Sequence, residues 1–165
     1  MAIAILGLAI TPAEKALLAE KAPGPAQFGA ALASLGHMGT IAYFSWWISY
    51  VLRSADPMTP ELANQLAPIA WGLAFELGLV GAWVWIIAWV GARHRLVPRG
   101  FVRLSIVKAL SFWFTLVAVA VESRPLVVIG LGATAVFVGP AWHLWVARLF
   151  PKPVRKPTKE EILVH

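Results

Sequence analysis

The chain has 165 residues, of which 59% are hydrophobic and only 13% are charged, whereas soluble domains carry about 25% charged residues. A water-soluble domain of this size lacks the interior volume to bury so much apolar surface, so the sequence predicts an all-α integral membrane protein in a lipid bilayer. The net charge of +6 does not indicate a nucleic-acid partner, because the basic residues flank apolar stretches. The absence of cysteine excludes disulfides, thiolate metal sites and cysteine nucleophiles.

Residues 1–29 are expected to form a cytoplasmic, interfacial segment. Within it, residues 1–10 are apolar but too short to cross a bilayer. Thr11, Pro12 and Glu14 then form the pattern of a helix start, with a capping hydroxyl, a first-turn proline and a capping-box acid. The short helix that follows interleaves apolar residues with glutamate and lysine, which predicts an amphipathic helix at the membrane surface. An uncleaved signal anchor is the alternative interpretation of this segment.

Four longer apolar stretches have the length of membrane-spanning helices, about 20 residues each. They predict an antiparallel bundle of four transmembrane helices with spans at about 30–52, 66–90, 101–121 and 125–150. Pro140 lies inside the last span and predicts a kink that frees a carbonyl group near Val136. Residues 151–165 are expected to form a cytoplasmic tail.

The distribution of lysine and arginine predicts the orientation. Two of the expected loops, 52–65 and 121–125, contain only Arg53 and Arg124, whereas the 91–100 loop and the C-terminal tail are rich in basic residues. Basic loops stay on the cytoplasmic side of a membrane. Both termini are therefore expected in the cytoplasm, with the chain as a multi-pass protein of a bacterial inner membrane.

Four ionisable side chains fall inside the predicted spans, where a charge is costly and function is the default explanation: His37, Glu76, Lys108 and His143. At about 1.5 Å per residue, His37, Lys108 and His143 share one depth, roughly 10 Å from the cytoplasmic face. Glu76 is expected near the bilayer centre, where a carboxyl group must be protonated, paired or beside a polar cavity. Lys108 is expected to extend its amine towards the cytoplasmic headgroups.

Two histidines at one depth on adjacent helices have two interpretations. His37 and His143 could be axial ligands of a haem b or a (bacterio)chlorophyll-type group, with Trp142 and Trp145 stacked on its ring. They could equally be a hydrogen-bonded structural pair that joins two helices. The deeper tryptophans leave open a quinone or a carotenoid, beside plain packing. The sequence therefore does not identify a cofactor.

Motifs typical of nucleotide-binding proteins, zinc proteases and serine hydrolases do not occur in the sequence, so it predicts no catalytic residue and no metal site. The leading hypothesis is a non-catalytic accessory subunit of a larger bacterial membrane complex of respiratory or photosynthetic type, in contact with other membrane subunits. One alternative is a tetrapyrrole-binding redox protein that uses His37 and His143. A second is an oligomeric small transporter or membrane enzyme that works through Glu76.

Overall fold

A computed structural model describes residues 1–53 and 72–149, and all regular structure in these two stretches is helical. The elements are α1 (Ala2–Ala19), α2 (Pro23–Arg53), the π-helix η1 (Glu76–Val80), α5 (Gly81–Arg93), α6 (Arg99–Ala120), α7 (Arg124–Gly132), the π-helix η2 (Ala133–Val138) and α8 (Gly139–Leu149). Consecutive segments join end to end, so Gly72–Arg93 and Arg124–Leu149 are each one continuous helical rod.

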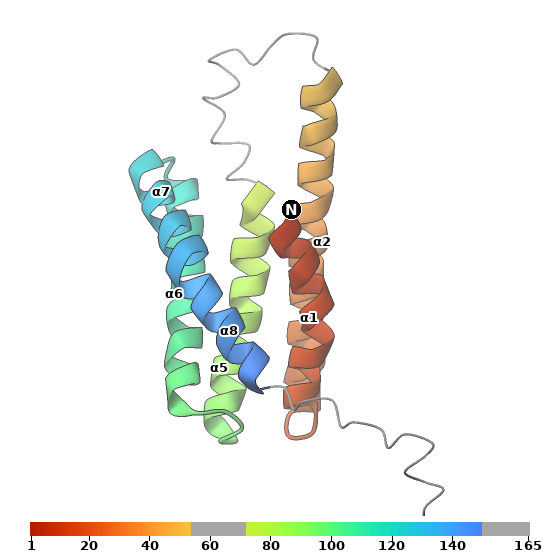
Figure 1. Ribbon diagram of the computed structural model, residues 1–165, viewed down its shortest axis with the longest axis vertical. Coiled ribbons are helices and arrows are strands. Elements are labelled where there is room, and N and C mark those ends of the chain that lie inside the picture. Colours follow the sequence, from red (N-terminus) through yellow and green to blue (C-terminus); the bar gives the residue numbers. More distant parts are fainter. Residues whose placement is uncertain (54–71, 150–165) are drawn as a thin grey trace, which may run out of the picture.

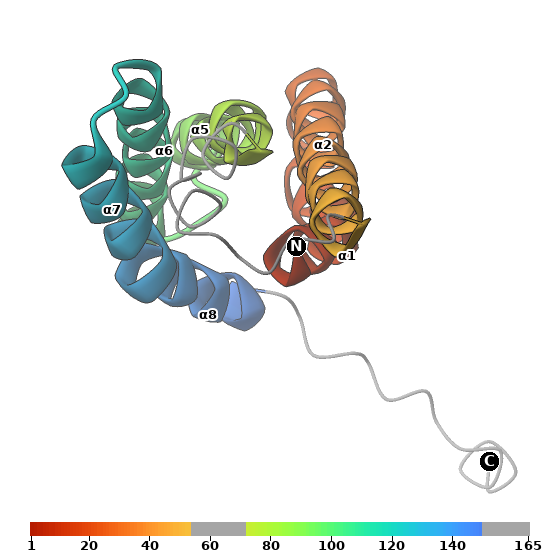
Figure 2. The same ribbon diagram turned by 90° about the horizontal axis from the view of Figure 1, so that it is seen from above.

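Helices that follow one another along the chain pack side by side (Figure 1). α1 and α2 form a hairpin that turns at residues 20–22, and α5 and α6 form a second hairpin that turns at residues 94–98. The two hairpins meet where α2 packs against η1 and α5. Seen from above, α5 lies between α2 and α6, and the rod from α7 to α8 runs obliquely past α6 (Figure 2).

The N-terminal helix is longer than the sequence pattern predicts. It begins at Ala2, so Thr11 and Pro12 lie inside it and the expected helix start at residue 11 is wrong. The Thr11 hydroxyl donates a 2.8 Å hydrogen bond to the Gly7 carbonyl one turn earlier and does not cap the helix. An interior proline weakens a helix. Here the packing of α1 against α2 and α5 offsets that cost.

Four helical rods in the described residues are long and apolar enough to cross a membrane: Ala2–Ala19, Gly72–Arg93, Arg99–Ala120 and Arg124–Leu149. The number of candidate membrane-spanning helices agrees with the sequence expectation, but one of the four helices is not the one expected. The expected span at 30–52 lies within α2, which is not among the four because glycine, serine and histidine lower its hydropathy. The N-terminal helix, expected at the membrane surface, is among them instead.

The other three expected spans fall on the observed rods, with ends shifted by one to three residues where the ends are described. The 91–100 loop is shorter than predicted, since α5 continues to Arg93 and α6 begins at Arg99. Residues 66–71 of the second predicted span, most of the 52–65 loop and the tail 151–165 lie outside the described residues.

The larger of two clusters of buried apolar side chains in the described residues joins α1, α2, η1, α5, α6 and α8, and its largest members are Trp83, Ile87, Phe101, Phe112 and Trp142. Glycine lets the helices approach each other closely, since a Cβ atom at position 29 of α2 would overlap the Trp83 ring of α5. The outward faces are apolar too, as shown by these large exposed side chains: Trp89, Leu110, Val117, Ile129 and Phe137. Such outward faces suit hydrocarbon rather than water.

The expected disturbance near Pro140 takes the form of a π-helix. Pro140 lacks the N–H group that would donate to the Val136 carbonyl in an α-helix. The wider turns of η2, Ala133–Val138, directly precede Gly139 and Pro140 and take up this interruption. The rod remains continuous through the proline.

Candidate functional site

Four ionisable side chains from four different helical segments are buried together. They come from α1, α2, η1 and α6 and are at most 8% exposed: Glu14, His37, Glu76 and Lys108. Their charges act on one another, because Glu14 interacts electrostatically with Lys108 and His37, and Lys108 also interacts with Glu76. Charges gathered inside an apolar helical body are the strongest functional candidate in the described residues. We call these four residues the charged cluster.

His37 and Glu76 form the closest pair in the charged cluster. The Nδ1 atom of His37 lies 2.9 Å from Oε1 of Glu76. The two atoms are in contact distance, but the ring nitrogen is not aligned for a regular hydrogen bond. The second carboxyl oxygen, Oε2 of Glu76, is buried and has no hydrogen-bond partner among the described residues. One oxygen of the carboxyl group is therefore free to hold a proton or to accept a hydrogen bond.

The backbone around Glu76 departs from the α-helix and comes close to α2. Glu76 is the first residue of the π-helix η1, and such short π-segments occur often at functional sites. A Cβ atom at Gly36 would lie 2.9 Å from a Val80 methyl group and 3.0 Å from the Phe75 carbonyl oxygen. The glycine beside His37 thus allows the contact between α2 and η1 that brings the histidine to the carboxyl group.

The N-terminal helix covers another edge of the His37 ring. A Cβ atom at Gly7 would overlap the Cε1 and Nε2 atoms of His37, so this edge of the ring packs directly on the α1 backbone. Thr11 lies one turn further along α1 and is buried on the same face as Gly7. Protein therefore surrounds the ring of His37 from α1, α2 and η1.

Glu14 is a member of the charged cluster that the sequence pattern did not reveal. Its carboxyl oxygen Oε2 accepts a 2.7 Å hydrogen bond from the indole N–H of Trp83 on α5. A helix start at residue 11 would place Glu14 in an exposed capping box. In the continuous helix, Gly7, Thr11, Glu14 and Leu18 recur every three or four residues and share one buried face. This spacing is the sequence feature from which the burial of Glu14 could have been predicted.

Lys108 points into the helical body and not towards the headgroups, so the expected outward extension of its amine is wrong. The side chain is 3% exposed, and its Nζ atom lies 3.6 Å from the centre of the Trp142 ring. A cation above an indole ring is stabilised electrostatically, more so when water is excluded. The same indole donates a 2.9 Å hydrogen bond to the Ser105 hydroxyl, one turn before Lys108 on α6. Trp142 thereby fixes the position of the amine.

His143 bonds to its own helix. Its Nδ1 atom lies 2.7 Å from the Gly139 carbonyl oxygen, one turn earlier. A carbonyl oxygen only accepts hydrogen bonds, so Nδ1 carries the ring proton and Nε2 keeps its lone pair. His143 is also within electrostatic range of Lys108, His37 and Glu76. It therefore belongs to the surroundings of the charged cluster, with one ring nitrogen available as a ligand.

The residues expected around a tetrapyrrole already have protein partners. The ring of Trp142 stacks on Phe101 at a centroid distance of 5.8 Å, and Trp145 also packs edge-on against Phe101. His37 contacts Glu76 and the α1 backbone. The ligand role of His37, His143, Trp142 and Trp145 stays a prediction.

Within residues 1–53 and 72–149, no group of three or more His, Cys, Asp or Glu side chains is arranged to hold a metal ion. Comparison with known proteins supplies no relative: no family model, curated protein or solved structure matches this chain. The function must therefore be argued from the charged cluster itself.

A double-mutant cycle tests whether Lys108 and Glu14 depend on each other. Lys108→Met removes the one buried lysine or arginine side chain among the described residues and leaves two carboxyl groups in an apolar interior. We expect a clear loss of stability, because an uncompensated buried charge is costly. Adding Glu14→Gln should restore part of the lost stability. The interaction free energy between the two substitutions should be about 1 kcal/mol.

The measurement is thermal unfolding of the four proteins in the same detergent. Arg148→Met, at an exposed position of α8, is the matched control and should change the midpoint little. Additive effects of Lys108→Met and Glu14→Gln would show that the two side chains act independently.

Proposed function

We propose that this chain is a multi-pass membrane protein that binds and transfers protons at the charged cluster, as an oligomeric small transporter or membrane enzyme working through Glu76. The observation that carries the proposal is the 2.9 Å contact between His37 Nδ1 and Glu76 Oε1, with no hydrogen-bond partner for Oε2 of the same carboxyl group in residues 1–53 and 72–149. Imidazole and carboxyl groups are the commonest proton donors and acceptors in proteins. Buried between helices, this pair fits the proton relays of membrane proteins.

The electrostatic links within the charged cluster support a relay rather than an isolated acid. Lys108 acts on both Glu14 and Glu76, and His37 acts on Glu14. A proton that arrives at one member changes the charge that acts on the others. Two carboxyl groups, one imidazole and one amine can hold different numbers of protons without a change of fold. That property is what proton coupling requires.

Substitution of Glu76 is the direct test. Glu76→Gln keeps the shape of the side chain but removes its titration, so we expect proton uptake into voltage-driven proteoliposomes to fall at least about tenfold. The infrared band of a protonated carboxyl group should lose intensity in the same variant. Glu122→Gln, at an exposed position after α6, is the matched control.

The wild-type protein must also move protons faster than empty vesicles. Proton uptake by Glu76→Gln at the wild-type rate would overturn the role of Glu76, and wild-type uptake no faster than through lipid alone would overturn the relay.

We further propose an antiparallel arrangement of the helices across a bacterial inner membrane, with the basic end in the cytoplasm. The turn between α1 and α2 and the connection between α5 and α6 lie at the same end of the molecule (Figure 1). Described basic side chains gather at this end: Lys15, Lys21, Arg93, Arg95, Arg99, Arg103 and Arg148. The positive-inside rule supports a cytoplasmic position for this end and for the tail that follows α8.

The N-terminus lies at the opposite end of the molecule from the α5–α6 connection (Figure 1). α1 is apolar enough to span, and Glu14 is buried against Trp83. We therefore propose that both α1 and α2 cross the membrane and that the N-terminus faces outward, instead of the interfacial helix and the cytoplasmic N-terminus expected from the sequence.

Single cysteines test this topology, since the chain contains none of its own. Ile3→Cys and His94→Cys place exposed thiols at the two ends. We expect a membrane-impermeant maleimide to label position 3 from outside intact cells and position 94 only after the membrane is opened. Labelling of both positions from the same side would show that α1 does not cross the membrane and lies at its surface.

One observation favours a second function, a tetrapyrrole held by His143 alone. Its Nδ1 proton is committed to Gly139, which leaves Nε2 oriented as a ligand, and such a hydrogen bond fixes metal-binding histidines in general. The accessory-subunit hypothesis is a further proposal, because a proton-binding subunit can also work inside a larger complex.

Extraction from native membranes in mild detergent tests both of these proposals. A bound tetrapyrrole gives a visible or near-infrared spectrum that is lost in His143→Ala, and an accessory subunit brings other chains with it. A colourless protein that purifies without other chains would exclude both.

A further inference from the structure

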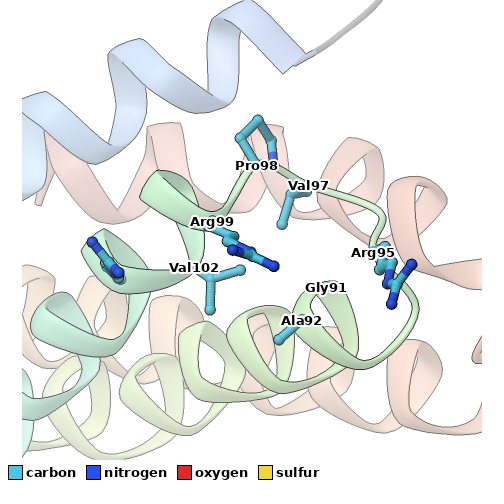
Figure 3. Close-up of a pocket in the computed structure, with 8 residues that line it drawn as sticks. Gly91, Ala92, Arg95, Val97, Pro98, Arg99 and Val102 are labelled. Atoms are coloured by element: carbon cyan, nitrogen blue, oxygen red, sulfur yellow. The ribbon is translucent and has the colours of Figure 1, made fainter.

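A pocket lined by arginine lies at the basic end, outside the charged cluster. It has a volume of about 610 Å³ and is formed by the end of α5, the connection to α6 and the first turn of α6. Three arginines contribute to its wall, Arg95, Arg99 and Arg103. Figure 3 labels Arg95 and Arg99. The apolar part of the wall comes from these residues: Gly91, Ala92, Val97, Pro98 and Val102.

The three arginines have no carboxylate partner in the described residues. The ion pairs there join Glu20 to Lys21 and Glu76 to His37, both away from this pocket. Three positive charges in the wall of one pocket repel one another, and a bound anion would offset this repulsion. Arginine is the side chain best suited to a phosphate group, because its planar fork donates two parallel hydrogen bonds.

Arg95 occupies a backbone conformation that arginine does not favour. Its φ angle is +54°, in the left-handed region. It follows the end of α5, where the Leu96 N–H donates to the Gly91 carbonyl and closes the helix. Glycine or asparagine is the usual residue at such a position. An arginine there costs about 1 kcal/mol, and its side chain lines the pocket.

The pocket lies where two candidate spans, Gly72–Arg93 and Arg99–Ala120, leave the membrane. Directly above Arg103, α6 presents an exposed apolar stripe at helical spacing: Val107, Leu110, Phe114, Val117 and Val121. An amphiphile with its phosphate among the arginines can lay its acyl chains along this stripe. A free anion would make no use of it.

We propose that this pocket binds the phosphodiester headgroup of an anionic phospholipid from the cytoplasmic leaflet. Basic pockets between helices on this side of a membrane bind such headgroups in general. The proposal depends on the basic end facing the cytoplasm but not on proton transfer at the charged cluster. A failure of lipid binding therefore leaves the role of Glu76 untouched, and the reverse also holds.

The test is lipid binding to the full chain in detergent, measured by native mass spectrometry and by the rise in unfolding temperature on adding lipid. We expect phosphatidylglycerol to bind and phosphatidylcholine with the same acyl chains to bind weakly. Arg95→Asn combined with Arg99→Gln and Arg103→Gln should weaken phosphatidylglycerol binding about a hundredfold. The matched control removes three charges at the same end outside the pocket, by Lys21→Gln, Arg93→Gln and Arg148→Gln, and should change affinity less than about threefold.

Two further variants keep the test decisive if the triple substitution disturbs the fold. Arg95→Asn alone relieves the unfavourable φ angle, so it should not lower stability but should weaken lipid binding about fivefold. Ala92→Leu fills the pocket without changing charge and should also weaken binding. If the triple pocket variant and the triple control variant lost the same lipid affinity, the lipid would bind to the basic surface in general and not to this pocket. If inorganic phosphate at the same concentrations raised the unfolding temperature as much as phosphatidylglycerol does, the pocket would be a site for free anions. That result would overturn the lipid assignment.

Discussion

Hydrocarbon cannot solvate a charge, so an ionisable side chain inside a membrane helix needs partners from the protein itself. In this chain the partners come from different helices. Glu14 accepts a hydrogen bond from Trp83 of α5, Glu76 contacts His37 of α2, and Lys108 lies on the ring of Trp142 of α8. None of these contacts lies within a single helical hairpin. The charged cluster and the packing of α1, α2, α5, α6 and α8 therefore depend on each other.

Small residues make these contacts geometrically accessible. Without a side chain at Gly7, the His37 ring rests on the backbone of α1, and without one at Gly36, α2 approaches the turn that begins with Glu76. Between membrane helices, where water does not drive association, such close backbone approach is a main source of packing energy. The glycines that permit tight packing thus also determine which ionisable groups meet. The same glycine positions therefore serve both the packing of the helices and the contacts of the ionisable groups.

The helical class and three of the four expected spans follow from composition and apolar run length, because these properties are local along the sequence. The pairing of His37 with Glu76 does not, since it depends on where each helix begins. The predicted span started at residue 30, whereas α2 starts at Pro23, which places His37 about 10 Å further from the start of its helix. Glu14 was missed for a related reason: the capping pattern at Thr11 is a local signal, and tertiary packing overrides it.

The π-helix at Glu76 bears on the relation between this cluster and motion. Its turn holds one more residue than an α-turn, so a return to α-geometry shifts the rest of the rod by one residue and rotates its side chains. Protonation of Glu76 removes the charge that favours its contact with His37, and with it one reason for the widened turn. Trp83, the hydrogen-bond partner of Glu14, lies seven residues after Glu76 on the same rod, about two turns further along. The rod that contains Glu76 therefore also holds the hydrogen-bond partner of Glu14, so the two acids are linked through one helix as well as through the electrostatic interactions of Lys108 with both.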